Sequence, residues 1–356
     1  MMKQLYRTIT FCILILLSFK TITNAQDKYA TTGNGYGVRE ILEFDASDYN
    51  MLKITNQHGN ITIKGWDRDT IEVQSLINVE APGSNSAEEV LDYISIERAN
   101  RAGMLIFRTQ FDDEFFSNYP FSVEYTVHLP KQLMLDITNN LGDVLIQNID
   151  GKISLHLDYG NLHLINSNSK KAHTFNLNFA EAKLDSCQSV KGFLNNCTLT
   201  ADNVTKLDFK SEYSLLKLGK TKSIALHSST DRINITESDS IKITGNQLLV
   251  NIKKVNTYGF FEIEKGQLMI KGANQLAHLS VSNKMANTII SLPSEYTYVL
   301  NGEITNGELN HPNINQLQVL REGTKESFTG HIGTEGNTTG QLILFNENSD
   351  LTIKTY

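Results

Sequence analysis

The sequence predicts an all-β fold, in which a β-rich N-terminal part leads into a single-stranded β-solenoid of stacked rungs at residues 132–292. Short strands return there at a period of roughly 15–20 residues, which is typical of stacked arrays. Each unit holds two runs of alternating apolar and polar residues, separated by Asn, Ser, Asp, Gly or Lys. Such alternation gives a strand one inward and one outward face. The chain has only 5 prolines, which also suits a protein built of strands and turns.

Three of these units show the period directly: KISLHLDYGNLHLINSNS from Lys152, TKLDFKSEYSLLKLGKT from Thr205 and KSIALHSSTDRINITESD from Lys222. In the first unit, the alternation predicts inward side chains at Ile153, Leu155, Leu157, Leu162 and Leu164. It predicts outward side chains at Ser154, His156, Asp158 and His163.

The first 25 residues have the features of a cleavable signal peptide. Lys3 and Arg7 precede an apolar run, and Thr23-Asn24-Ala25 forms a small-residue cleavage site. The run is too short to span a membrane, and no later window approaches the roughly 18 consecutive apolar residues of a transmembrane helix. We therefore expect an exported protein, located in the periplasm, on the outer-membrane surface or outside the cell, with a flexible leader at residues 26–38.

The charge of the chain disfavours two classes of partner. The formal net charge is −7, and it becomes about −10 once the three basic residues of the signal peptide are removed. Binding to nucleic acid or to an anionic membrane requires clustered Lys and Arg. Nucleic acid is therefore excluded as an expected partner.

The N-terminal part, residues 39–131, is predicted to consist of strands with one short helix. We expect the first strand to start at Arg39. Ser86 with Glu89 three residues later forms a capping-box pattern, which predicts a helix over residues 87–93. The strands expected next are Tyr93–Arg98, Met104–Gln110 and Ser122–Leu129. After the array, residues 293–356 are expected to form capping strands, with Leu351–Tyr356 closing the array.

The segment FDDEFFSNYPF, residues 111–121, is the one candidate partner-binding loop. Its aromatic and acidic residues are Phe111, Asp112, Asp113, Glu114, Phe115, Phe116 and Tyr119. One interpretation is a contact loop with aromatic anchors, in which the acids could hold calcium. The other, which we favour, is a surface loop whose aromatic rings fold back over the array. A calcium site needs more oxygen ligands than three adjacent acids can direct at one point.

Cys187 and Cys197 are expected to remain unlinked although export permits disulfides. If Leu184 stacks on Leu199, Cys197 lies level with Ala182, five residues from Cys187. That separation is about 16 Å along a strand, whereas a disulfide needs Cα atoms within about 7 Å.

The sequence contains no pattern that indicates catalysis, a cofactor or a metal. The nine histidines are scattered, and His156 and His163 have no further ligand at metal-binding spacing. A polysaccharide-cleaving solenoid presents paired carboxylates on neighbouring rungs. Asp185 and Asp202 are the nearest candidates, and they also fit ordinary solubilising acids. We expect no catalytic residues, no cofactor and no enzyme activity.

Three segments resemble the toast-rack family of exported bacterial β-proteins, the putative adhesins: residues 52–74, 123–166 and 328–356. The similarity lies in strand-and-turn patterns such as Leu141-Gly142-Asp143-Val144 and Tyr159-Gly160-Asn161-Leu162, and this turn pattern decays over residues 170–290. The resemblance implies an exported β-solenoid and offers no catalytic residues.

Three functions are compatible with these features. The leading hypothesis is a non-enzymatic, adhesin-like envelope protein whose repetitive β surface binds a protein or a glycan. An alternative, implied by the resemblance, is a periplasmic accessory protein of envelope-stress signalling through a sigma and anti-sigma factor. A polysaccharide-active β-helix enzyme is the third.

Overall fold

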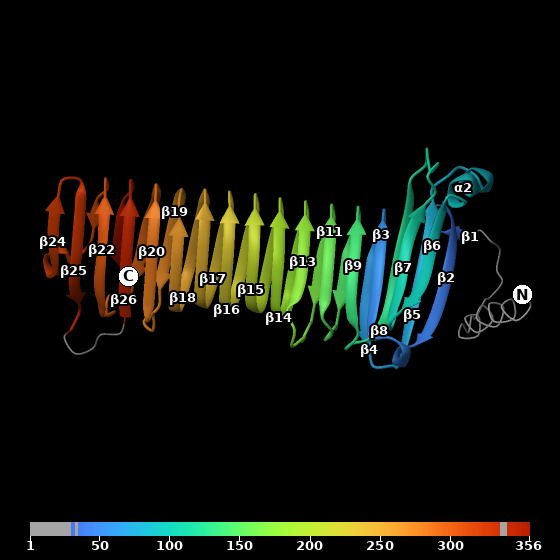
Figure 1. Cartoon of the computed structure of the whole chain (residues 1–356), viewed down its shortest axis with the longest axis horizontal. Coiled ribbons are helices and arrows are strands. Elements are labelled where there is room, and N and C mark those ends of the chain that lie inside the picture. The colour runs from blue at the N-terminus through green and yellow to red at the C-terminus, as the bar shows by residue number, and fades with distance from the viewer. Residues whose placement is uncertain (1–29, 33–34, 335–339) are drawn as a thin grey trace, which may run out of the picture. The chain divides into compact units, whose positions relative to one another are not determined.

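The computed structural model describes residues 30–32, 35–334 and 340–356 (Figure 1). The signal peptide expected at residues 1–25 lies outside these residues. The chain divides into two compact units, Met1–Lys152 and Ile153–Tyr356. The domain boundaries expected from the sequence, at residues 38/39, 131/132 and 292/293, remain predictions. No helix in the described part of the chain is long and apolar enough to cross a membrane.

The first unit consists almost entirely of strands. Its elements are β1 (Ala30–Thr32), β2 (Gly35–Asp45), the short 3-10 helix η1 (Ala46–Asp48), β3 (Met51–Gln57), β4 (Ile61–Trp66), β5 (Thr70–Val79), α2 (Ser84–Leu91), β6 (Ile94–Arg101), β7 (Met104–Phe111), β8 (Phe121–Pro130), β9 (Met134–Asn140) and β10 (Val144–Gln147). Strands β1 and β2 therefore begin before Arg39, where the sequence predicted the first strand.

The strands of the first unit do not pair in chain order. Strand β3 pairs in parallel with both β7 and β9, and β4 pairs in parallel with both β8 and β10. Strand β5 joins β2 to β8 through antiparallel pairings. The alternating side chains of these strands are buried on one face, and the core includes Phe107 and Tyr125.

The predicted capping box of the helix is wrong. Helix α2 starts at Ser84 after the N-cap residue Gly83, so Ser86 and Glu89 lie inside it. No side chain caps its N-terminus. The helix exists because Ala87, Val90 and Leu91 bury one face, and this packing decides its position more strongly than the cap pattern does.

The second unit is a stack of two-layered rungs. Its strands are β11 (Ile153–Asp158), β12 (Asn161–Ile165), β13 (His173–Asn178), β14 (Glu181–Asn195), β15 (Thr198–Glu212), β16 (Leu215–Ser229), β17 (Arg232–Asn246), β18 (Leu248–Ile263), β19 (Gly266–Gly272), β20 (His278–Lys284), β21 (Ala286–Leu292), β22 (Tyr298–Thr305), β23 (Leu309–Asn310), β24 (Leu317–Glu322), β25 (Lys325–Ile332), β26 (Gly340–Glu347) and β27 (Leu351–Thr355), with the 3-10 helix η2 (Ile314–Gln316). The all-β solenoid predicted from the sequence is confirmed.

The long strand β14 pairs with two different earlier strands. The first half of β14 pairs with β12, and its second half pairs with β13. Strands β14 to β18 then follow one another in parallel (Figure 1). Within β14 to β17, equivalent positions lie 17 residues apart: Ala182 pairs with Leu199, Leu199 with Leu216, and Leu216 with Ile233. The apolar side chains at these positions form continuous buried columns.

The predicted inward residues are confirmed, because Ile153, Leu155, Leu157, Leu162 and Leu164 are all buried. The register predicted between the segments now seen as β14 and β15 is wrong by two residues. Leu184 pairs with Ala201, not with Leu199, so Cys197 is level with Ala180. Because side chains alternate with a period of two, a two-residue shift leaves every side chain on the same face. The pattern of apolar residues alone therefore could not exclude a register that is shifted by two residues. Both cysteines are buried free thiols.

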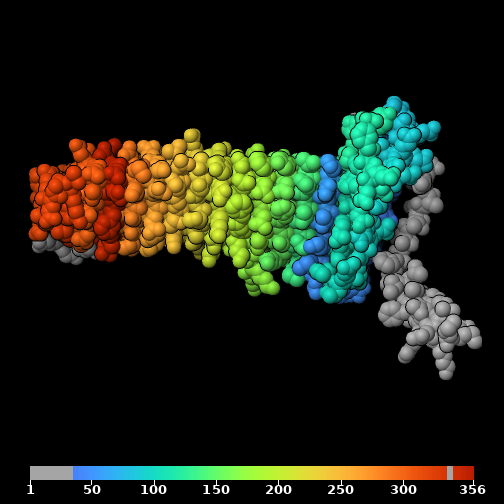
Figure 2. All heavy atoms as spheres, turned by 45° about the horizontal axis from the view of Figure 1, so that its top comes forward, coloured from blue at the N-terminus to red at the C-terminus, as the bar shows by residue number. Residues whose placement is uncertain are grey.

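The C-terminal strands are inserted into the stack. Strand β26 pairs in parallel with β20 on one side and with β22 on the other. Strand β27, which contains Leu351–Thr355, lies between β21 and β23. Figure 2 shows this as a red band of C-terminal residues between orange bands that precede it in the sequence. Residues far apart in the sequence therefore become neighbours on the outer face.

Candidate functional site

The predicted contact loop lies between β7 and β8 of the first unit. The rings of Phe111 and Phe115 pack with 4.8 Å between their centroids, and both contact the ring of Phe121. The His58 ring contacts Phe111 and Phe121 at 5.9 and 5.0 Å. Most of the loop's aromatic surface is thus used within the first unit. Phe116 is different, since 71% of its surface is exposed.

The acids of this loop shape its turn. The carboxylate of Asp112 accepts a hydrogen bond of 3.1 Å from the backbone N–H of Glu114. The N–H of Tyr119 donates to the hydroxyl of Ser117, also at 3.1 Å. Asp113 and Glu114 are exposed. Within the described residues, no group of three or more His, Cys, Asp or Glu side chains is placed to hold a metal ion.

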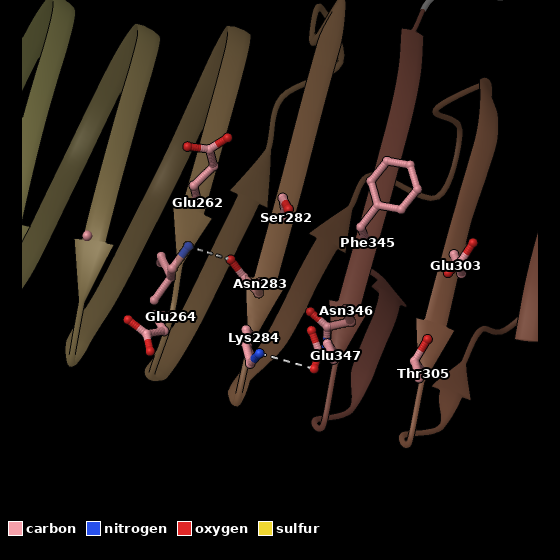
Figure 3. Close-up of a pocket in the computed structure, with 12 residues that line it drawn as sticks. Glu262, Glu264, Ser282, Asn283, Lys284, Glu303, Thr305, Phe345, Asn346 and Glu347 are labelled. Atoms are coloured by element: carbon pink, nitrogen blue, oxygen red, sulfur yellow. Dashed lines mark hydrogen bonds and ion pairs between the residues drawn. The ribbon is translucent and has the colours of Figure 1, made fainter. Parts of the chain in front are cut away.

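A groove that sequence reasoning missed lies on the second unit, and we call it the acidic groove (Figure 3). It has a volume of about 510 Å³ and crosses β18, β20, β26 and β22. Strand register aligns one row of its side chains: Glu262 pairs with Ser282, Ser282 with Phe345, and Phe345 with Glu303. Phe345 is 46% exposed in the middle of this row.

A second row lies beside the first, towards the strand ends. Lys284 pairs in register with Glu347, and Glu347 with Thr305. Glu264 lies at the end of this row in Figure 3. The groove is therefore lined by four glutamates and by one lysine, Lys284.

Ion pairs leave part of this negative charge unbalanced. Lys284 Nζ lies 3.3 Å from Glu347 Oε1, and Lys325 Nζ lies 2.7 Å from Glu303 Oε2. Among the described residues, the ion pairs of this part of the second unit involve neither Glu262 nor Glu264. Both glutamates are exposed. The groove therefore presents carboxylate acceptors around one exposed aromatic ring.

Buried asparagines fix the floor of the acidic groove. Asn283 Oδ1 accepts a hydrogen bond of 3.1 Å from the N–H of Ile263, and Asn283 Nδ2 donates to Thr288 Oγ1 at 2.7 Å. Asn346 Nδ2 lies 3.1 and 3.0 Å from the carbonyl oxygens of Ser349 and Asp350. Because these amides already bond to neighbouring rungs and turns, they hold the groove in shape.

The two histidines considered for metal binding contact different carboxylates. His156 Nε2 lies 3.1 Å from Asp158 Oδ2, and His163 Nε2 lies 2.8 Å from Asp185 Oδ2. Lys183 Nζ lies 3.0 Å from the other oxygen of Asp185. Burial acts to raise the pKa of Asp185, but Lys183 and His163 outweigh it and hold this pKa below its usual value.

The sequence carried no local signal for the acidic groove. Its row Glu262, Ser282, Phe345 and Glu303 comes from four strands, and Phe345 reaches the row only because β26 is inserted between β20 and β22. A non-local insertion of this kind leaves no spacing pattern. The acids also alternate with inward residues, as ordinary solvent-facing side chains do.

No family model matches the chain, and no curated protein matches it. Among solved structures, similar chains include a putative cell adhesion protein from Clostridium sporogenes, with 12% identity and a TM-score of 0.20, covering 90% of this chain and 100% of that one. A putative adhesin from Parabacteroides distasonis has 13% identity and a TM-score of 0.34, covering 71% and 96%. A putative lipid binding protein from the same organism has 8% identity and a TM-score of 0.32, covering 88% and 96%.

Two of these names agree with the resemblance to putative adhesins found in the sequence.

Proposed function

We propose that the chain is an exported, non-enzymatic, adhesin-like protein that binds a protein or glycan at the cell envelope through its outward side chains. The acidic groove is the observation that carries this proposal. It combines an exposed aromatic ring, Phe345, with Glu303 on the next strand and with Glu262 two strands away on the other side, all in strand register. An aromatic anchor within a polar rim is the usual composition of a binding hot spot.

The pKa shifts and burial of two carboxyl groups in the second unit, Asp185 and Asp231, support a binding role over a catalytic one. A glycosidase needs a general acid that stays protonated, and so a carboxyl group with a raised pKa. Lys183 and His163, acting against burial, lower the pKa of Asp185. The pKa of Asp231 is raised, by burial first of all. However, Asp231 is only 3% exposed and is hydrogen bonded to the backbone, so we assign it a structural role.

The experiment compares binding of the purified exported protein and its variants to native envelope material. We expect Phe345→Ser and Glu303→Gln each to weaken binding by about 1 kcal/mol, and more at the aromatic anchor. Glu89→Gln on helix α2 is the matched control, because Glu89 is exposed and lies outside the groove. Equal binding by the wild type and both groove variants would remove the acidic groove from the proposal.

A further inference from the structure

Aromatic residues occupy unusual backbone positions at one edge of the second unit. Tyr159, Phe179 and Tyr213 have φ values of 55°, 51° and 53°, in the left-handed region. Bulky side chains rarely adopt this conformation, whereas Asn does so readily. Equivalent turns on neighbouring rungs carry Asn196, Thr230 and Gln247, with φ values of 53°, 58° and 56°.

Burial does not explain these aromatic residues. Tyr159, Phe179 and Tyr213 are 54%, 49% and 59% exposed. Each therefore combines an unfavourable backbone conformation with an exposed apolar ring. Strain that packing does not compensate is found most often at functional positions.

The turn residues form a column along the stack. The N–H of Phe179 donates to the carbonyl of Asn195 at 2.9 Å, just before the next turn, and the N–H of Tyr213 bonds in the same way to Ser229 at 3.0 Å. The rings of Tyr159 and Phe179 are nearly parallel, at 5°, with centroids 4.9 Å apart. Asn196 comes next, so Tyr213 lies two strand spacings from Phe179, or roughly 10 Å.

A groove runs beside this column, and we call it the turn-edge groove. Its volume is about 490 Å³, and its lining includes Asn196, Tyr213, Thr230, Asp231, Arg232 and Gln247. Cys197, Ser214 and Asp231 are its buried residues. The groove spans several rungs, so it suits an extended ligand better than a compact one.

The polar side chains of the turn-edge groove are mainly uncharged. Thr230 Oγ1 donates to Gln247 Oε1 at 3.0 Å, an arrangement that keeps the two N–H donors of the Gln247 amide for other partners. Asn196 Nδ2 donates to Asn195 Oδ1 at 3.0 Å, and the Asn196 carbonyl oxygen keeps its acceptor capacity. Arg232 is the one basic residue of the lining. Donors and acceptors beside an exposed ring match a ligand with apolar faces and hydroxyl edges.

We infer that the turn-edge groove binds an uncharged polysaccharide, with one sugar ring against Tyr213. Further sugar rings of the same polymer continue beyond the groove, along the column of turn residues towards Phe179 and Tyr159. Asn196, Thr230, Arg232 and Gln247 supply the hydrogen bonds to the hydroxyl groups. This inference rests on the proposed binding function and names a ligand class for a second site, formed by residues other than those of the acidic groove.

The test uses the purified exported protein and affinity electrophoresis in gels that contain one polysaccharide each. The uncharged probes are laminarin, dextran and galactomannan, and the anionic probes are alginate and polygalacturonate. The decisive variant is Tyr213→Asn, which places at this turn the residue found naturally at Asn196. Tyr213→Phe keeps the ring, and Phe345→Ser changes the acidic groove only.

We expect at least one uncharged polysaccharide to retard the wild type, and Tyr213→Asn to weaken that affinity about tenfold. Tyr213→Phe should stay within about threefold of the wild type, and Phe345→Ser should bind equally. Tyr213→Asn should be at least as resistant to urea as the wild type, because Asn relieves the backbone strain. A loss of binding then cannot be attributed to unfolding.

Three results would overturn the inference: binding to none of the uncharged polymers, binding to the anionic ones alone, or unchanged binding by Tyr213→Asn. The two proposals fail separately. If Phe345→Ser weakens binding to native envelope material while Tyr213→Asn binds every uncharged polysaccharide as the wild type does, the proposed function stands and the turn-edge groove is excluded.

Discussion

The carboxylate of Asp231 accepts a hydrogen bond of 2.6 Å from the backbone N–H of Ser214, which lies one rung earlier in the second unit. Asp231 is 3% exposed. Burial raises its pKa, while the Ser214 N–H and the hydroxyls of Ser211 and Ser228 act in the opposite direction. Burial prevails, so the pKa of Asp231 in the folded protein lies above its ordinary value.

This pKa shift makes the stability of the protein depend on pH. The contribution of Asp231 is complete below its unfolded pKa, near 3.8, and is lost as the pH rises through the raised folded pKa. Asp231→Asn keeps an acceptor for the Ser214 N–H and cannot ionise. We therefore expect the wild type to lose stability relative to this variant as the pH rises above 3.8. Urea unfolding of both proteins from acidic to neutral pH measures this, and a difference that stays constant would contradict it.

Inward and outward positions of one rung should differ sharply in how much a substitution changes the free energy of unfolding. Leu157 is fully buried, so Leu157→Asp places an unpaired charge in the apolar column and should cost several kcal/mol. His156, next to it in β11, has a side chain that is 43% exposed. His156→Ser should therefore change the free energy of unfolding by no more than about 0.5 kcal/mol. Equal effects in denaturant unfolding would disprove the assigned faces.

Much of the fold could be predicted because buried residues alternate with outward-facing residues along each strand, and this alternation is visible in the sequence. Alternation identified Leu155 and Leu157 as inward residues, and both are buried. Alternation does not determine how far one rung shifts against the next, so the pairing of Leu184 with Ala201 was missed. The insertion of β26 between β20 and β22 is a long-range event that no local pattern records.

Cys187 and Cys197 should remain thiols in the exported protein. Burial raises the pKa of Cys187 to about 12 and also raises that of Cys197. Neither thiol should react with a labelling reagent in the native state, because the thiolate is the reactive form. Both should react after denaturation without reductant. Mass spectrometry counts the labels, and a denatured protein without label would show that a disulfide had formed.

The loop between β7 and β8 should contribute to binding through Phe116 alone among its aromatic residues. Phe116→Ser should weaken binding to native envelope material by about 1 kcal/mol or more, as loss of an aromatic anchor does. It should leave the unfolding free energy within about 0.5 kcal/mol, because the ring is exposed. Phe115→Ser is the contrasting variant, since Phe115 packs on Phe111 and Phe121 and its loss should destabilise the protein. Unchanged binding by Phe116→Ser would remove the loop from the hypothesis.

The candidate sites were predictable only where one sequence segment contains them. The aromatic and acidic composition of residues 111–121 is visible in the sequence, although the packing of Phe115 away from solvent is not. The column of turn residues left a weak signal in the sequence. Tyr159, Phe179 and Tyr213 each interrupt the alternation of apolar and polar residues at a turn. Their shared backbone conformation and exposure became evident only from the structure.

Binding without catalysis can be tested by measuring polysaccharide binding and polysaccharide cleavage on the same samples. Affinity electrophoresis reports binding, and release of new reducing ends reports cleavage, for the wild type, Asp231→Asn and Asp185→Asn. Asp231 is the carboxyl group of the described residues whose raised pKa would best suit a general acid. We expect the protein to bind polysaccharide, and we expect none of the three samples to release new reducing ends. Cleavage by the wild type that disappears in either single variant would contradict this expectation.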